Sequence, residues 1–207
     1  MRHEKKYRIE NASVREVTQN ILDHPASFCT AFPDRYINSI YFDSADLTSF
    51  QQNQDGISKR IKYRIRWYGE DLTKAKKPNL EIKIRDNQFG KKETIALPDF
   101  DLNNPEELTK IAREHIPAEL IPKVITRYQR AYYLSHNEIL RATIDKDIAY
   151  YGFDKYSYKK TAALDSAIVL ELKCDKEEVD YLTEASQHIP FRMVKNSKYV
   201  NGVFAQY

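Results

Sequence analysis

Cationic side chains recur at every second position in the stretch KRIKYRIRWYG, residues 59–69. Side chains of an extended chain alternate between its two faces, so Lys62, Arg64 and Arg66 share one face. Trp67 lies on the other face, with the apolar row. Guanidinium groups bind phosphate oxygens through paired hydrogen bonds, and ammonium groups add point charge. Such a row could bind a polyanion, or it could simply face solvent.

The same alternation recurs in further segments of the chain. The polar rows are Glu81, Lys83 and Arg85; Glu171 and Lys173; Arg141, Thr143 and Asp145; and Arg130 with Thr126, Tyr128 and Tyr132. For a single strand, a solvated outer face is the better explanation, because antiparallel sheets commonly wet one face. Repetition over several strands favours charged rows that face an enclosed space.

Three amphipathic helices, expected at residues 14–22, 108–116 and 179–189, also need apolar surface to cover. If they pack outside the sheet, the apolar rows lie beneath them and the charged rows face inward. A charged lumen is costly unless a highly charged ligand fills it, because buried cations must be paired.

Segments rich in Ile, Val, Tyr and Thr dominate the chain and predict strands. They are residues 4–10, 36–44, 59–68, 79–86, 91–98, 123–135, 140–151 and 167–175. With few, short helices between them, they favour a closed antiparallel sheet. We therefore expect a single domain over residues 1–207, of the α+β class with β dominant. Its architecture would be an eight-stranded antiparallel tunnel barrel with a charged lumen and helices packed outside.

Composition excludes several classes of protein. Lys plus Arg is 33 and Asp plus Glu is 30, so the net charge of +3 does not indicate a nucleic-acid binder. Cys29 and Cys174 form no CxxC pair, which favours reduced thiols. The N-terminal residues resemble no signal peptide, and no apolar run approaches the ~20 residues that span a bilayer. No glycine-rich phosphate loop is present. We expect a soluble, cytoplasmic protein.

Carboxylates among the cations could hold a divalent metal that bridges phosphate oxygens. The alternation places Glu171 on the charged row, either as a metal ligand or as a plain ion-pair partner. For Glu81, an ion pair with Lys83 or Arg85 explains the position as well as metal binding does. Asp145 could be a ligand or a strand-end cap. A site of this kind would favour phosphoryl transfer by position and electrostatics.

Six motifs occur in an order that resembles the triphosphate tunnel metalloenzyme superfamily. They are YRIRWYG (63–69), LEIKIR (80–85), RYQRAYY (127–133), RATID (141–145), VLELKCD (169–175) and NSKYVNGV (196–203). More closely they resemble its VTC branch, the vacuolar transporter chaperone domain that makes polyphosphate. The resemblance implies a tunnel that binds nucleoside triphosphate and Mn²⁺ or Mg²⁺. It also implies transfer of the terminal phosphoryl group of ATP to a growing polyphosphate chain.

The resemblance also assigns residues to roles. The catalytic, phosphate-gripping candidates are Lys6, Arg64, Arg66, Lys83, Arg130, Arg141 and Lys198. The substrate-binding candidates are Lys91 or Lys92 on the following strand, the weaker match Lys195, and Tyr63. Glu171 matches the metal-binding glutamate, and Glu81 is the second metal candidate.

One departure bears on the branch of the superfamily. Hydrolase and cyclase relatives resemble a first-strand pattern E-x-E-x-K, whereas residues 2–6 read RHEKK, with Arg2 in place of the first glutamate. This departure favours a polymerase. The chain shows no regulatory segment or membrane helix of the eukaryotic polymerases, so it would act alone or with a separate membrane or regulatory partner. A tripolyphosphate or nucleoside-triphosphate hydrolase and a non-catalytic polyanion-binding module stay as alternatives.

Overall fold

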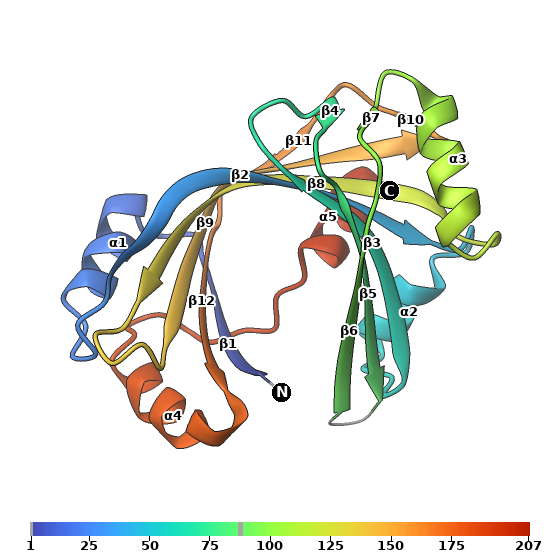
Figure 1. Ribbon diagram of the computed structural model, residues 1–207. Helices are drawn as coiled ribbons and strands as arrows, with labels where there is room; N and C mark the ends of the chain where they lie inside the picture. Colours follow the sequence, from blue (N-terminus) through green and yellow to red (C-terminus); the bar gives the residue numbers. More distant parts are fainter. Residues whose placement is uncertain (1, 87–88) are drawn as a thin grey trace. The chain divides into compact units, whose positions relative to one another are not determined.

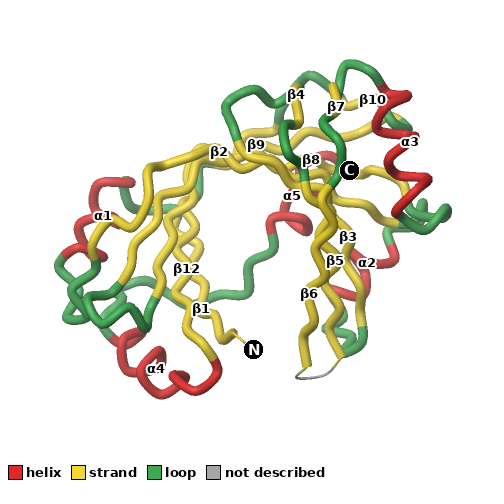
Figure 2. Tube along the Cα trace, viewed as in Figure 1, coloured by secondary structure: helices red, strands yellow, loops and turns green. Residues whose placement is uncertain are grey.

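The computed structural model describes residues 2–86 and 89–207, in which strands dominate (Figure 2). The long strands are β1 (Arg2–Ile9), β2 (Cys29–Asp43), β3 (Arg60–Tyr68), β5 (Asn79–Asp86), β6 (Phe89–Ala96), β8 (Ile121–Leu134), β9 (Arg141–Asp154) and β12 (Ile168–Asp175). The short strands are β4 (Lys74–Ala75), β7 (Phe100–Asp101), β10 (Ser157–Tyr158) and β11 (Ala163–Asp165). The helices are α1 (Val14–Leu22), α2 (Thr48–Gln54), α3 (Pro105–His115), α4 (Val179–Gln187) and α5 (Lys198–Gln206), with a 3₁₀ turn at Lys176–Glu178.

The long strands form one hydrogen-bonded sheet in the order β1-β12-β9-β8-β2-β3-β5-β6, and β10 and β11 pair with β9. Strands β4 and β7 form a separate pair. Each predicted strand appears, although β2 begins at Cys29 rather than at residue 36, and β6 ends at Ala96. The α+β class with dominant strands is therefore confirmed.

The chain folds into two compact units, each assembled from segments that are distant in sequence. Unit 1 comprises Met1–Arg35, Tyr128–Ile148 and Asp165–Asn196. Unit 2 comprises Tyr36–Arg127, Ala149–Leu164 and Ser197–Tyr207. Strands β2, β8 and β9 contribute residues to both units.

In unit 1, α1 and α4 pack against the apolar face of its strands (Figure 1). The register sets Tyr7 opposite Leu170 and Leu170 opposite Ile144, so these side chains share a face. They form one buried core with Ile21 of α1 and Leu182 of α4. The charged residues between them on each strand lie on the opposite face, which we call the polar face of unit 1.

In unit 2, α3 packs against the apolar face of its strands (Figure 1). Ile65 of β3 lies opposite Leu80 of β5, and both are fully buried. With Trp67 they form one core with Leu108 and Ile111 of α3. In each unit, helices expected from amphipathic patterns therefore cover the apolar rows, and the charged rows occupy the other face, as predicted.

The sequence pattern does not predict helix α5, and this helix packs on the polar face of unit 2. The ring of Tyr199 stacks on that of Tyr41, with ring centroids 5.3 Å apart. Gly202 allows close approach, because a Cβ atom there would lie 2.6 Å from Cγ1 of Val124 and 2.9 Å from Cδ1 of Tyr150. Unlike the three helices expected from amphipathic patterns, α5 thus lies over a polar row.

Asp43, at the end of β2, joins α2 and α5 to the sheet. Its carboxylate accepts hydrogen bonds from the backbone N–H groups of Ser49 and Phe50, in the first turn of α2. It also accepts a hydrogen bond from the hydroxyl of Tyr199. Since the Asp43 side chain is fully buried, these donors satisfy a charge that would otherwise be costly. None of the helices in residues 2–86 and 89–207 is both long and apolar enough to cross a membrane.

His24 follows the end of α1 and links it to α4. The ring is 4% exposed; Nε2 lies 2.9 Å from the carbonyl oxygen of Ala185, and Nδ1 accepts the N–H of Ala26 at 3.0 Å. Burial lowers the pKa of His24, and nearby His188 adds to this effect. A proton on Nδ1 would point at the backbone N–H of Ala26, so the ring is neutral in the folded protein.

We predict that the free energy of unfolding falls as the pH drops below about 6.5, the ordinary pKa of an unfolded histidine. A pKa that is lower in the folded state gives stability that is present above this pH and lost below it. Urea unfolding at pH 7.5 and 5.0 measures the effect. His24→Gln should reduce the difference in the free energy of unfolding between the two pH values, and substitution of the exposed His136 by Gln should not. Equal pH dependence in the wild type and His24→Gln would contradict this role.

Candidate functional site

The polar face of unit 2 gathers cations on three neighbouring strands. Its charged residues on β3, β5 and β6 are Arg60, Lys62, Arg64, Arg66, Glu81, Lys83, Arg85 and Lys92. The register sets Lys62 opposite Lys83 and Arg60 opposite Arg85, so like charges are neighbours. Burial and the charge of Arg85 lower the pKa of Arg60. Among the described residues of these three strands, Glu81 is the only carboxylate on this face.

Glu81 lies among these cations and is 7% exposed. Its Oε2 atom lies 2.5 Å from Nε of Arg64 and 4.0 Å from Nη1 of Arg66. Its Oε1 atom accepts a hydrogen bond from Nζ of Lys92 at 2.6 Å. Burial alone would raise the pKa of Glu81, but the charges of Arg64, Arg66 and Lys92 lower it to about 2. Glu81 is therefore ionised at any physiological pH, with cations at both oxygens.

Strand β2 adds Ser39 and Tyr41 to this face, and neither is among the residues predicted from the sequence. Arg66 donates a hydrogen bond to Oγ of Ser39 at 3.2 Å, and Arg64 donates one to Oη of Tyr41 at 3.0 Å. Burial alone would raise the pKa of Tyr41, but Arg64 and Arg66 lower it to about 8. The signal that could have found both residues is the register, which sets Ser39 opposite Arg66 and Tyr41 opposite Arg64.

Lys198 reaches the same face from the first turn of α5. Oγ of Ser197 accepts the backbone N–H of Val200 and begins this helix. Lys198 is 9% exposed, and its charge contributes to the lowered pKa of Tyr41. Helix α5 therefore places Lys198 close to the phenol that contacts Arg64.

The polar face of unit 1 balances cations with carboxylates. Nζ of Lys6 lies 2.9 Å from Oε1 of Glu4 and 3.4 Å from Oε1 of Glu171. Nζ of Lys173 lies 2.6 Å from Oε2 of Glu171. Burial alone would lower the pKa of Lys6, but Glu171 and Glu4 raise it. Glu4 is not among the residues predicted from the sequence, although alternation along β1 puts it on the same face as Lys6.

Arg130 and Asp145 form a paired contact between β8 and β9 on this face. Nε and Nη2 of Arg130 lie 2.5 and 2.7 Å from the two carboxylate oxygens of Asp145. Nη2 also lies 3.9 Å from Oε2 of Glu171. Burial alone would lower the pKa of Arg130, but the charge of Asp145 raises it. Asp145 is fully buried and acts as the partner of Arg130, so it is not a strand-end cap.

Thr143 lies on the polar face of unit 1, opposite Glu171 in the register. Its side chain is 8% exposed, and within the described residues its hydroxyl has no hydrogen-bond partner. A buried hydroxyl without a partner costs about 1–3 kcal/mol. An oxygen of a bound phosphate or water would satisfy it.

The structure divides the predicted site residues between the two polar faces. Unit 2 holds Arg64, Arg66, Glu81, Lys83, Lys92 and Lys198, and unit 1 holds Lys6, Arg130, Arg141 and Glu171. Arg141 and Lys83 are exposed on these faces.

Three candidates lie elsewhere. Tyr63 packs against the apolar core of unit 2, so the expectation that it contacts substrate does not fit its position. Lys91 lies opposite Ile84, on the apolar side, and pairs with Glu93 at 2.7 Å. Of these two substrate-binding candidates, Lys92 is therefore the one on the polar face. Lys195 is exposed, next to a segment that pairs with β1.

The carboxylates of the two faces differ in how well they suit a metal. Among the described residues, no group of three or more His, Cys, Asp or Glu side chains is arranged to hold a metal ion. Mg²⁺ often binds through one or two carboxylates together with substrate phosphates and water, and Mn²⁺ favours the same oxygen donors. Glu171, whose charge interacts with that of nearby Glu4, fits this mode. Glu81 has no second carboxylate beside it among the described residues of β3, β5 and β6 on its face, and it fits this mode less well.

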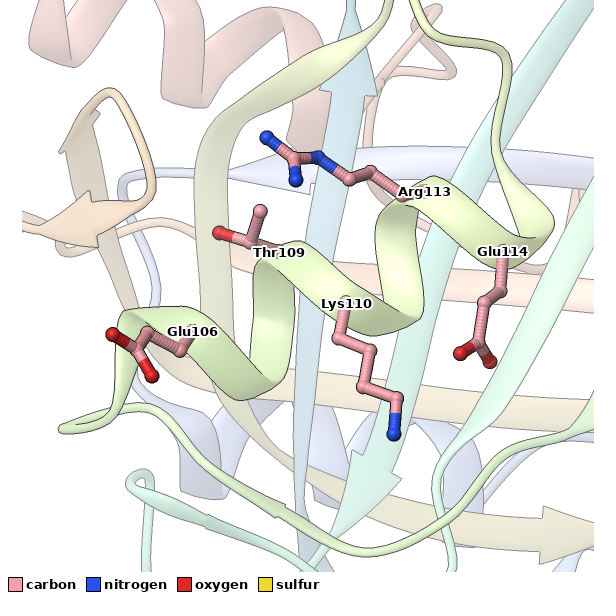
Figure 3. Close-up of a pocket in the computed structure, with 5 residues that line it drawn as sticks. All are labelled: Glu106, Thr109, Lys110, Arg113 and Glu114. Atoms are coloured by element: carbon pink, nitrogen blue, oxygen red, sulfur yellow. The ribbon is translucent and has the colours of Figure 1, made fainter.

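A surface pocket along α3 does not belong to either polar face (Figure 3). Its lining residues are Glu106, Thr109, Lys110, Arg113 and Glu114, all on this one helix. Its lining has two carboxylates and two cations, without the excess of cations found on β3 and β5.

Comparison with solved structures defines the class of fold. A putative adenylyl cyclase from Hippeastrum, described as having a dominant triphosphatase activity, matches with a TM-score of 0.58 and 17% identity. The match covers 100% of this chain and 97% of that one. A putative adenylate cyclase from Vibrio parahaemolyticus matches with a TM-score of 0.54 and 10% identity, covering 97% of each chain. The PH1819 protein from Pyrococcus horikoshii matches with a TM-score of 0.55 and 9% identity, again covering 97% of each chain. The chain thus shares the fold of these proteins.

The sequence identifies the family within that class. The VTC domain matches residues 1–207, the whole chain. The protein therefore belongs to the VTC domain family, as the order of motifs from YRIRWYG to NSKYVNGV predicts. No curated protein matches the sequence.

We predict that Asp145→Ala lowers the free energy of unfolding by about 3–5 kcal/mol, because it leaves the buried guanidinium of Arg130 without its paired partner. Urea denaturation followed by circular dichroism measures the loss. The double variant Arg130→Met, Asp145→Leu removes both charges and should recover most of it. A loss below about 1 kcal/mol in the single variant would mean that solvent already screens the pair.

Proposed function

We propose that the protein is a metal-dependent polyphosphate polymerase that transfers the terminal phosphoryl group of ATP to the end of a polyphosphate chain. An oxygen at the chain end attacks the terminal phosphorus, the bond from that phosphorus to the bridging oxygen breaks, and ADP leaves. The observation that carries the proposal is the excess of cations on the polar face of unit 2. There, Glu81 is the only carboxylate among the described residues of β3, β5 and β6.

The cations of unit 2 differ in the contacts they can make with phosphates. Arg64 and Arg66 present planar guanidinium groups that suit paired hydrogen bonds to phosphate oxygens. Lys62, Lys83 and Lys92 supply point charges in a row across three strands, which suits a chain of successive phosphates. Phosphoryl transfer needs little else from a protein than position and charge stabilisation.

In this proposal, unit 1 contributes the carboxylate that binds the metal. Mn²⁺ or Mg²⁺, when bound, neutralises charge on the phosphate oxygens. Glu171 would hold it, with Glu4 nearby, and Lys6 and Lys173, which lie beside this carboxylate, would supply cations for phosphate oxygens. The hydroxyl of Thr143 would gain its missing partner there. The enclosed tunnel stays a prediction.

A hydrolase of triphosphates is the second candidate. The triphosphatase activity described for the structurally similar Hippeastrum protein favours it, as does Glu4 beside Lys6 on the polar face of unit 1. Arg2, where such relatives carry a first glutamate, favours the polymerase.

Incubation of the purified protein with ATP and Mn²⁺ or Mg²⁺ distinguishes these functions. Long-chain polyphosphate together with ADP supports the polymerase. Orthophosphate without chains supports the hydrolase. Binding of tripolyphosphate without turnover of either kind would indicate a non-catalytic polyanion-binding module and overturn the proposal.

We predict that Glu171→Gln abolishes turnover, because the neutral amide binds a divalent cation poorly, while tripolyphosphate still binds. Product formation and calorimetric titration with tripolyphosphate in EDTA measure the two properties separately. Full activity of this variant would contradict the assignment of the metal to Glu171.

Neighbouring lysines on β6 offer a matched test of the phosphate site. Lys92→Ala should weaken tripolyphosphate binding about tenfold or more, since a hydrogen bond to a charged group contributes about 1.5–3 kcal/mol. Lys91→Ala removes the same charge from the apolar side and should change the dissociation constant less than twofold. Calorimetric titration at low salt gives both values. Equal effects of the two substitutions would place the phosphate site away from this face.

A further inference from the structure

Glu81 lies among the cations of the proposed phosphate site on unit 2. Both of its oxygens contact cations: Oε2 contacts Arg64 at 2.5 Å, and Oε1 contacts Lys92 at 2.6 Å. Arg66 approaches the same carboxylate at 4.0 Å. The donors are a guanidinium edge and an ammonium group, the groups that bind phosphate oxygens best in proteins.

The strand register fixes this contact. Glu81 lies directly opposite Arg64 on β3 and next to Lys92 on β6, because Lys92 is opposite Lys83, two residues along β5 from Glu81. At 7% exposure, the carboxylate cannot turn into solvent without a change in its surroundings. With a pKa of about 2 it carries its charge at any physiological pH, so protonation does not release the cations.

We propose that Glu81 is an internal competitor for the phosphate site: its carboxylate holds Arg64 and Lys92 until an incoming phosphate displaces it. The inference rests on the proposed function and names the group that sets the affinity of that site. Displacement lowers the affinity for every phosphate ligand by a common factor, because each ligand must first separate the same ion pairs.

This common factor has a consequence for the choice of ligand. A single orthophosphate carries about two negative charges. On this face it only takes over the contacts of one carboxylate, so its binding gains little free energy. A chain of phosphates also reaches Lys62 and Lys83 in the neighbouring rows, and these added contacts offset the displacement. Glu81 therefore keeps free orthophosphate out of the site while chains and nucleoside triphosphates still bind.

Two other roles for Glu81 make different predictions. If Glu81 only positions Arg64 and Lys92, its removal weakens phosphate binding. If it is a metal ligand, its removal matters only when Mn²⁺ or Mg²⁺ is present. An internal competitor is the one role in which removal tightens binding without metal.

The test compares two glutamates that lie on opposite sides of the same hairpin. Glu81→Gln removes the competitor, whereas Glu93→Gln removes an equal charge from the apolar side, where Glu93 pairs with Lys91 at 2.7 Å. Calorimetric titration in EDTA with sodium tripolyphosphate and with orthophosphate gives the dissociation constants. We expect Glu81→Gln to tighten both ligands about tenfold or more, and Glu93→Gln to change them less than twofold.

Thermal unfolding supplies a second measurement. Without Glu81 the cations repel each other, so Glu81→Gln should unfold at a lower temperature than the wild type when no ligand is present. Saturating tripolyphosphate should raise its unfolding temperature by more than it raises that of the wild type. Glu81→Asp keeps the charge with a shorter reach and should give intermediate values, and this variant serves if the glutamine variant does not fold.

The outcomes separate the inference from the proposed function. Wild-type protein that binds no tripolyphosphate would overturn the proposed function itself. Wild-type protein that binds it, with weaker or unchanged binding in Glu81→Gln, would overturn only the role of Glu81. Equal tightening in Glu81→Gln and Glu93→Gln would show a general effect of charge and would likewise overturn this role.

Discussion

The alternation of side chains along extended strands is the constraint on which both polar faces depend. It places Arg64 and Arg66 on one face of β3 and Ile65 and Trp67 on the other. The pairing of β3 with β5 extends this division to β5. Because α3 buries the apolar row, the cations must share the opposite face. The same constraint in unit 1 places Glu171 away from the core that α1 and α4 cover. In each unit, burial of the apolar face beneath helices thus determines which way the charged face points.

The two units use this arrangement differently. On unit 2, Lys62 lies opposite Lys83 and Arg60 opposite Arg85, an arrangement that favours an anion between them. On unit 1, Lys6, Lys173 and Arg130 each have a carboxylate within 4.0 Å, and the face is nearly neutral without a ligand. The cations of β3, β5 and β6 on unit 2 therefore outnumber the carboxylates beside them, whereas these three cations of unit 1 are paired with carboxylates.

Local patterns were enough to predict the strands, the amphipathic helices and the direction of the charged rows. Choosing between Lys91 and Lys92 needed the register of β5 with β6, which a hairpin of undetermined turn length leaves open by one residue. Helix α5 escaped prediction because KYVNGVFAQ contains a glycine and no clear polar stripe; its burial on the polar face depends on contacts with Tyr41 and Asp43, distant in sequence. The pairing of Asp145 with Arg130 is equally non-local.

Lysine footprinting tests most directly whether the cationic rows of unit 2 bind phosphates. The protein is acylated with and without tripolyphosphate in EDTA, and each lysine is quantified by mass spectrometry. Tripolyphosphate should protect Lys62, Lys83 and Lys92, while Lys91 and Lys110 react equally in both samples. Protection of Lys91 to the same extent as Lys92, or no protection of Lys62, Lys83 and Lys92 under conditions where tripolyphosphate binds, would contradict phosphate binding by these rows.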